Sequence, residues 1–322
     1  MIRGRTGETG NMDIKISSYN VHSCVGNDGG YSVDRVARVI RDGCADIECI
    51  QEIEVNDSLL QNRVWSKLHD DDQPSMIAKL TGLQYHVFSP AIRSIASSRY
   101  KECHDEVTNN DVSGNFNDDE WKRRCSSETS STQNRNDMGK FGIAILSRYP
   151  IVSIRIHQYK RYKNKTIRNC MACLVSLPND TRIWIVNTHL GCHFIGKEQH
   201  QQAKELVSFI HSLSLKINHT EIAGVVVCGD MNSPPIYQSI KTLRRSGMLD
   251  TWKLNGQGHS GTFPSYTTIP CFRKLIRLDY IFMREMGRRR ILCKLVYVQD
   301  DGPSTRLASD HLPLCAVFVI GD

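Results

Sequence analysis

The sequence has no long uninterrupted apolar run: the longest, such as residues 316–320, are only the length of a strand. A helix that spans a membrane needs about 18 or more apolar residues, so the sequence predicts no such helix. The N-terminal residues 1–15 are polar and lack the apolar core of a secretory signal peptide. We therefore expect an intracellular monomer, cytoplasmic or nuclear.

A strong excess of one charge is also missing, because 41 Lys and Arg stand against 34 Asp and Glu, a net charge of +7. This balance permits a polyanionic partner such as nucleic acid without requiring one. The distribution is uneven: residues 138–179 contain no carboxylate, and basic side chains gather at 155–168 and again at 284–294. Both clusters fit solvated loops as well as contact with a polyanion.

Disulfides are not expected, although the chain has 12 cysteines. Cys49, Cys173, Cys228 and Cys315 lie inside apolar runs, where thiols behave as small core side chains. Without a signal peptide, reduced thiols are the expectation. Cys170 and Cys173 lack the second cysteine pair of a zinc site, and in a strand they would point to opposite faces.

Short apolar runs rich in Val, Ile and Leu recur along the chain and predict strands. They lie at 14–19, 47–51, 85–88, 142–147, 151–157, 171–177, 183–188, 225–229, 278–283, 291–298 and 314–320. Helical patterns occupy 33–41, 199–213 and 235–246, the first with Ser32 as its N-cap. Many strands with fewer helices indicate a mixed α/β sandwich.

Residues 93–137 have a different composition, because only nine of these 45 residues are hydrophobic. Such a segment buries too little apolar surface to offset the entropy of ordering it. We therefore expect one domain over residues 1–322, interrupted by a disordered polar insertion at about 93–137.

Deletion of the insertion tests this interpretation. Deleting about residues 100–135 and joining the ends through a short Gly/Ser linker should leave the melting temperature nearly unchanged, because loop closure depends weakly on length. A large loss of stability in thermal unfolding would contradict it.

Polar side chains stand at the ends of several predicted strands. They are Asn20, Gln51-Glu52, Thr188-His189, Gly229-Asp230-Met231-Asn232, Asp279 within Leu278-Asp279-Tyr280, and Ser309-Asp310-His311. One such residue is usually a turn former or a helix cap, but six sets in one chain are harder to explain that way. Open α/β sheets carry functional groups just beyond their strand ends. Carboxylate and amide oxygens suit Mg²⁺ or Mn²⁺, and His–Asp sets suit proton transfer. Together they indicate metal-assisted phosphoryl hydrolysis.

This ordered series resembles the endonuclease/exonuclease/phosphatase superfamily, the deoxyribonuclease-like fold, over about residues 14–320. The segments Gly26-Asn27-Asp28-Gly29-Gly30, Gly142 to Pro150 and Thr262-Phe263-Pro264 are similar to its bacterial-type hydrolase branch. The resemblance implies a four-layer sandwich of two packed mixed β-sheets flanked by helices, with the site at one edge.

The resemblance also implies roles for individual residues. Glu52 would be the main Mg²⁺ ligand, with Mn²⁺ as a substitute, Asn20 would bind metal or phosphate, and Asp310 would be a further metal or water ligand. Asp230 would orient or deprotonate the attacking water, and Asn232 would hold the phosphate. His189 would donate to a phosphate oxygen, and His311 would act on the phosphoryl group with Asp279 fixing its tautomer. Arg168 would contact phosphate, although a surface charge is an equal alternative.

The expected function is therefore a Mg²⁺-dependent phosphoesterase acting on a phosphodiester or phosphomonoester. Nucleic acid is the first choice of substrate because of the basic segments. Inositol phosphates or phospholipids, as in a sphingomyelinase-like enzyme, are the alternative, since the catalytic set does not separate these classes. An inactive binding module of the same fold is a further alternative, which the intact set of motifs opposes.

Overall fold

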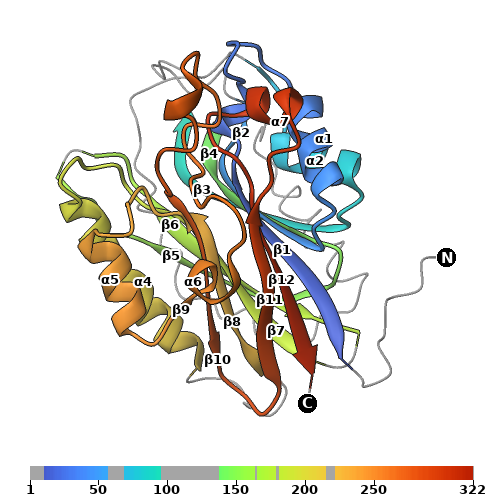
Figure 1. Cartoon of the computed structure of the whole chain (residues 1–322), viewed down its shortest axis with the longest axis vertical. Helices are drawn as coiled ribbons and strands as arrows, with labels where there is room; N and C mark the ends of the chain where they lie inside the picture. Colours follow the sequence, from blue (N-terminus) through green and yellow to red (C-terminus); the bar gives the residue numbers. More distant parts are fainter. Residues whose placement is uncertain are drawn as a thin grey trace.

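The computed structural model describes residues 11–56, 69–95, 138–163, 165–178, 181–214 and 222–321. In this part of the chain the strands form two six-stranded sheets, which pack face to face with helices on both outer sides (Figure 1). Each sheet contains parallel and antiparallel neighbours. The predicted four-layer α/β sandwich of two mixed sheets is confirmed.

The first sheet has the strand order β11-β12-β1-β2-β4-β3, and β1 and β2 at its centre are parallel. Its strands are β1 (Met12–Asn20), β2 (Ile47–Val55), β3 (Tyr85–Ile95), β4 (Met138–Ser147), β11 (Arg290–Val298) and β12 (Leu314–Gly321). Because the parallel strands β1 and β2 are joined by a helix, their carboxyl ends lie at the same edge of the sheet.

The second sheet repeats this plan with the order β5-β6-β7-β8-β10-β9, and β7 and β8 at its centre are parallel. Its strands are β5 (Ile151–Gln158), β6 (Asn169–Ser176), β7 (Arg182–His189), β8 (Ile222–Asp230), β9 (Leu249–Asp250) and β10 (Asp279–Glu285). Between the sheets lies an apolar core that includes the buried thiols Cys49, Cys173 and Cys228. Cys170 faces the opposite side of β6, against the helices, as the alternation of a strand predicts.

Helices cover the outer face of each sheet. On the first sheet pack α1 (Val33–Gly43), α2 (Gln73–Thr81) and α7 (Pro303–Ala308), and on the second α4 (Lys197–Ser214) and α5 (Gln238–Arg245). The short α6 (Thr251–Asn255) lies beside β10 and β11, and single 3-10 turns occur at η1 (His22–Cys24) and η4 (Pro270–Phe272). Helix α1 begins where Ser32 accepts a hydrogen bond from the Arg35 N–H. None of the described helices is long and apolar enough to cross a membrane.

All eleven predicted strands overlap observed strands, but the helix predictions were incomplete. The sequence analysis missed α2, α6 and α7, which are short; α2 buries only Ile77 and Ala78 among its apolar side chains. The helix predicted from residue 235 begins only at Gln238, because residues 235–237 form a turn. Strand β3 runs to Ile95, past the start of the insertion that we expected at about residue 93. The rest of the insertion lies outside the described residues.

A buried carboxyl group makes the fold sensitive to pH. Glu48 on β2 is 1% exposed, and its Oε1 has no hydrogen-bond partner. Burial raises the pKa of Glu48 to about 8, against the opposing effects of Ser17 and Lys15. The folded state thus favours the protonated carboxyl group of Glu48. The contribution of this group to the free energy of unfolding is fully present below its ordinary pKa of 4.5 and is lost as the pH rises toward 8.

Glu48→Gln removes this titration and should stabilise the protein at neutral and alkaline pH. The gain in unfolding free energy over the natural protein should grow by up to roughly 1.4 kcal/mol per pH unit across that window. Urea unfolding at about pH 5 and about pH 8 measures it. Asp42→Asn, at an exposed carboxylate on α1, is the matched control and should give a flat difference. An equal difference at both pH values for Glu48→Gln would contradict the prediction.

Candidate active site

The polar residues that the sequence places at strand ends meet at the carboxyl ends of the parallel central strands of the two sheets, β1 and β2 in the first and β7 and β8 in the second. Asn20 pairs in register with Gln51, and Asp230 pairs with both His189 and Asp279. The end of β8 requires a glycine before Asp230: Gly229 has a φ of +153°, and a Cβ there would lie 2.0 Å from the Thr188 carbonyl oxygen. The site is therefore assembled by strand register in each sheet and by the packing of the sheets.

Asp230 lies at the centre of the cluster and is buried. Its Oδ2 accepts a hydrogen bond from Asn20 Nδ2 across the sheet interface at 3.1 Å, and its Oδ1 accepts one from the Asn232 backbone N–H at 2.8 Å. Burial raises the pKa of Asp230 to about 7, against the opposing effect of His311. A carboxylate held this way near neutral pH is suited to take a proton from a water molecule.

His311 and Asp279 form a buried ion pair in which Nδ1 of His311 donates to Oδ2 of Asp279 at 2.7 Å. The other ring nitrogen, Nε2, points to the cluster and lies 3.8 Å from Asp230 Oδ2. Burial by itself lowers the pKa of His311, but the carboxylates of Asp279 and Asp230 outweigh it and hold that pKa well above its usual value. His311 is therefore a cation at neutral pH with one defined donor facing the site.

His189, at the end of β7, is oriented by Arg168. Arg168 Nη1 lies 3.1 Å from His189 Nδ1, and the side-chain nitrogen of Asn232 lies 3.0 Å from His189 Nε2, so a donor approaches each ring nitrogen. Nε2 also lies 3.5 Å from Asp230 Oδ2 and 3.8 Å from Glu52 Oε1. The structure thus places Arg168 inside the cluster; it is not an isolated surface charge.

Glu52 reaches the cluster because β2 is bulged at this residue. The pairing of β2 with β4 shifts between Gln51 and Ile53, and Glu52 has a φ of +55°. A residue with a side chain rarely adopts this conformation, which costs on the order of 1 kcal/mol and re-aims the side chain away from the strand alternation. Its carboxylate remains 16% exposed, the accessibility that a ligand of a partly hydrated ion needs.

The donor chemistry of the site fits a hard divalent cation. In the part of the chain that the structure describes, the carboxylates of Glu52, Asp230, Asp279 and Asp310 gather around two imidazoles and one guanidinium. Asp279 is engaged by His311, and the Asn20 Oδ1 accepts from the His22 backbone N–H at 3.0 Å, so Glu52 has the carboxylate that is most open to Mg²⁺ or Mn²⁺. Asp310 is half-buried next to His311, and its Oδ1 accepts a hydrogen bond from Ser309 Oγ at 3.3 Å. Among the described residues, no hydrogen bond or ion pair links Asp310 to Glu52.

Several supporting residues had no role assigned from the sequence. Asn187 accepts a hydrogen bond from Gln51 Nε2 at 2.7 Å and donates to the carbonyls of Ile50 and Ala144, which ties the two sheets together behind the site. Ser309 Oγ donates to the Asn20 carbonyl at 2.7 Å. A polar residue inside an apolar strand was the only available signal for Asn187, because its partner lies 136 positions away in the sequence.

Comparisons with known proteins identify the family of the chain. The family model described as "Endonuclease/Exonuclease/phosphatase family" matches residues 17–311, which include all the residues of the cluster. A search of curated protein sequences found no match.

Solved structures share the fold at low sequence identity. A mannosyl-6-phosphatase from Bacteroides thetaiotaomicron superposes with a TM-score of 0.62 at 16% identity, over 95% of this chain and 99% of that one. Truncated TDP2 from Caenorhabditis elegans gives 0.57 at 15% identity, over 95% and 97%. The human nocturnin catalytic domain, whose structure contains a bound sulfate anion, gives 0.57 at 17% identity, over 95% and 94%. From its family match and its fold, the chain belongs to the endonuclease/exonuclease/phosphatase family and is a phosphoric ester hydrolase.

Proposed function

We propose that the protein hydrolyses phosphate esters with Mg²⁺ as its cofactor, and that the cluster around Asp230 is the active site. The observation that carries the proposal is the convergence of oxygen donors and oriented imidazoles from both sheets on one carboxylate. Hydrolysis of a phosphate ester needs a base that takes a proton from the attacking water, hydrogen-bond donors to the non-bridging oxygens, and positive charge that offsets the negative charge of the phosphate. The cluster offers each of these.

Each side chain has a role that its contacts support. Asp230, held by Asn20 and by the Asn232 N–H, orients the attacking water and takes its proton. His189 and His311 each direct Nε2 toward Asp230 Oδ2, and from this side of the ring each would donate to the phosphoryl oxygens. Asn232 and Arg168 complete the phosphate contacts. Asp279 stabilises the ring of His311 with a proton on both Nδ1 and Nε2.

Glu52, with Asn20 and Asp310, would hold the Mg²⁺ ion, and Mn²⁺ would substitute for it. When bound, the ion supplies positive charge to the phosphate oxygens. Metal affinity should depend most on Glu52, the carboxylate at the bulge, because Asp230 and Asp279 are buried and hydrogen-bonded to Asn20 and His311.

The positive charge of one exposed segment bears on the class of substrate. The basic residues Lys160, Arg161, Lys163 and Lys165 are exposed on the segment that leads to Arg168. A polyanion such as nucleic acid fits this segment, and so does an anionic lipid surface. Nucleic acid, the first choice from the sequence, stays a prediction.

A hydrolysis panel tests the proposal. The purified protein is incubated with Mg²⁺ and plasmid, abasic duplex, single-stranded DNA, RNA, inositol phosphates, sphingomyelin and other phospholipids. We expect turnover of at least one phosphate ester and none in excess chelator. Hydrolysis that persists in chelator would reject the metal, and no hydrolysis of any ester by a folded protein would reject the activity.

A further inference from the structure

Large apolar side chains that are exposed to solvent are concentrated around the candidate active site. Of eleven such side chains in the described residues, seven lie on three loops, 194–196, 235–237 and 266–275. The first loop follows β7 and the second follows β8, the two strands that end in His189 and Asp230. The third leads from Phe263, whose ring lies 5.0 Å from that of His311. The site is thus flanked by apolar loops.

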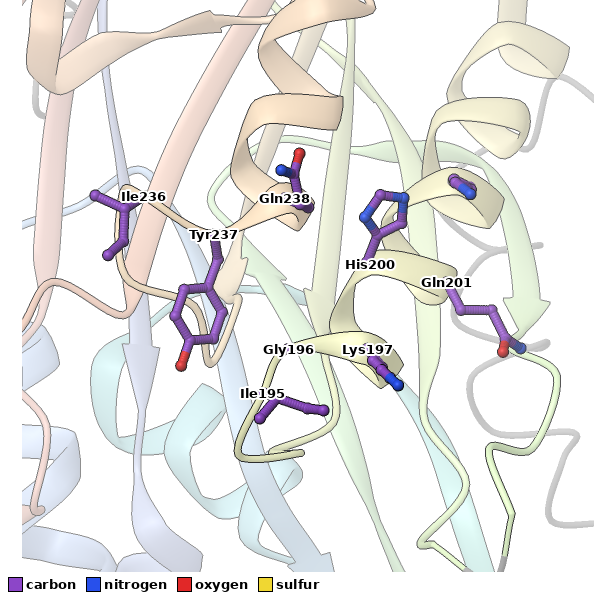
Figure 2. Close-up of a pocket in the computed structure, with 9 residues that line it drawn as sticks. Ile195, Gly196, Lys197, His200, Gln201, Ile236, Tyr237 and Gln238 are labelled. Carbon is purple, nitrogen blue, oxygen red and sulfur yellow. The ribbon is translucent and has the colours of Figure 1, made fainter.

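The first two loops close against each other and form a pocket of about 590 Å³. Figure 2 shows it between the first turns of α4 and the turn that precedes α5. The Tyr237 hydroxyl donates to the Phe194 carbonyl at 2.9 Å, and a Cβ at Gly196 would come within 2.6 Å of the Tyr237 ring. The tips beside the pocket are very exposed: Phe194 is 90%, Ile236 74% and Ile195 57% accessible.

A buried glutamine beside the pocket links the first loop to the site. Gln199, on the first turn of α4, is buried, and its Nε2 donates to the backbone carbonyls of Asn232 at 3.0 Å and His193 at 3.1 Å. The two loops therefore have defined positions relative to Asn232. A surface on which they rest would be held beside the phosphate-binding groups.

The charges around the apolar tips are cationic. Among the nine residues that line the pocket, Lys197 and Lys204 are the charged ones, His200 is titratable, and none is a carboxylate. The basic segment is adjacent, because the Tyr162 ring packs edge-on against His193 with ring centroids 5.3 Å apart. Exposed Lys and Arg side chains thus surround the tips on the side of α4 and on the side of β6.

An anionic bilayer satisfies both features at once. Apolar tips enter the boundary between headgroups and acyl chains, while the neighbouring lysines and arginines meet lipid phosphates. Nucleic acid matches the charge and the aromatic tip Phe194, since unpaired bases stack on aromatic rings, but it does not match the aliphatic tips Ile195 and Ile236. A second copy of the chain is disfavoured, since a symmetric contact would bring two cationic surfaces together.

We propose that loops 194–196 and 235–237, with Lys197 and Lys204, dock the active-site end of the protein on an anionic phospholipid bilayer, so that its substrate is a phosphate ester of a membrane lipid. The substrate half of this inference rests on the proposed function, and the docking half does not.

Co-sedimentation with vesicles tests the docking half in excess chelator, where no hydrolysis is needed. The full-length protein should bind vesicles of phosphatidylcholine mixed with an equal part of phosphatidylserine and bind phosphatidylcholine alone weakly. The triple variant Phe194→Ser, Ile195→Ser, Ile236→Ser should bind about a hundredfold more weakly, because three apolar insertions are lost. Lys197→Gln with Lys204→Gln should lose about tenfold at low salt and little at high salt.

Leu292→Ser is the matched control, because Leu292 on β11 is 58% exposed, as Ile195 is, and lies on the other sheet. It should bind like the natural protein, and circular dichroism should show every variant folded. The docking proposal is overturned if the natural protein does not bind anionic vesicles or if the triple variant binds equally well. It is also overturned if the triple change instead abolishes binding of single-stranded oligonucleotides, or converts a dimer to a monomer in sedimentation.

Hydrolysis in Mg²⁺ tests the substrate half. Release of the headgroup from a vesicle-borne phospholipid should slow at least tenfold in the triple variant and not in Leu292→Ser. An equal rate in all three proteins would overturn the lipid assignment. Vesicle binding without hydrolysis of any ester would reject the proposed function and leave docking intact.

Discussion

Asp279→Ala and His311→Ala should each lower the turnover number by about two powers of ten or more, in line with the loss of a positioned proton-transfer group. His311 keeps its charge and its orientation because Nδ1 donates to Asp279 at 2.7 Å. Without the Asp279 carboxylate, the ring loses both the partner that orients it and a main cause of its raised pKa, so the donor facing Asp230 is no longer held in place. Single-turnover rates at saturating substrate measure this effect separately from binding.

The double variant decides whether the two residues act as a unit. If they do, it should be little worse than the poorer single variant, because each single change already removes the same function. His157→Ala is the matched control: it breaks a His–Glu contact of 3.3 Å with Glu205 on the outer side of the second sheet and should leave turnover unchanged. Multiplicative losses in folded variants would show that Asp279 does not act through His311.

Glu52→Gln should weaken Mg²⁺ binding and reduce turnover by about two powers of ten, on the scale of other charge-stabilising groups in active sites. The change keeps the shape of the side chain and removes the charge that a hard cation requires. The concentration of Mg²⁺ at half-maximal rate should rise, and excess metal should restore part of the activity. Calorimetric titration with Mg²⁺ alone measures the affinity without substrate.

Stability distinguishes a metal ligand at this position from a structural residue. Glu52 holds a strained φ of +55° and adds a negative charge to a site that already contains Asp230. Glu52→Gly relieves the strain, so its melting temperature in chelator should equal or exceed that of the natural protein while activity is lost. The exposed Glu285→Gln, at the end of β10, should change neither quantity. A Glu52→Gln protein with unchanged Mg²⁺ affinity would remove Glu52 from the metal site.

The sequence by itself determined the sheets of this protein. Period-two and fully apolar runs such as 225–229 predicted every long strand, because a strand buried on both faces needs an unbroken apolar run. The polar residues at their ends were visible for the same reason: Asp230 and His189 interrupt such runs, and burying them is costly without partners. The short helices α2 and α7 were not visible, since few of their side chains enter the core.

Only the tertiary structure decided how these residues act on one another. The bulge that turns Glu52 toward His189 depends on the pairing of β2 with β4, and the contact of Asn20 with Asp230 spans 210 positions of sequence and two sheets. The contact of Arg168 with His189, which joins residues 21 positions apart, is set in the same way. Local sequence patterns report which side chains are buried, whereas distances between strand ends are set by register and sheet packing, which involve residues far apart in the chain.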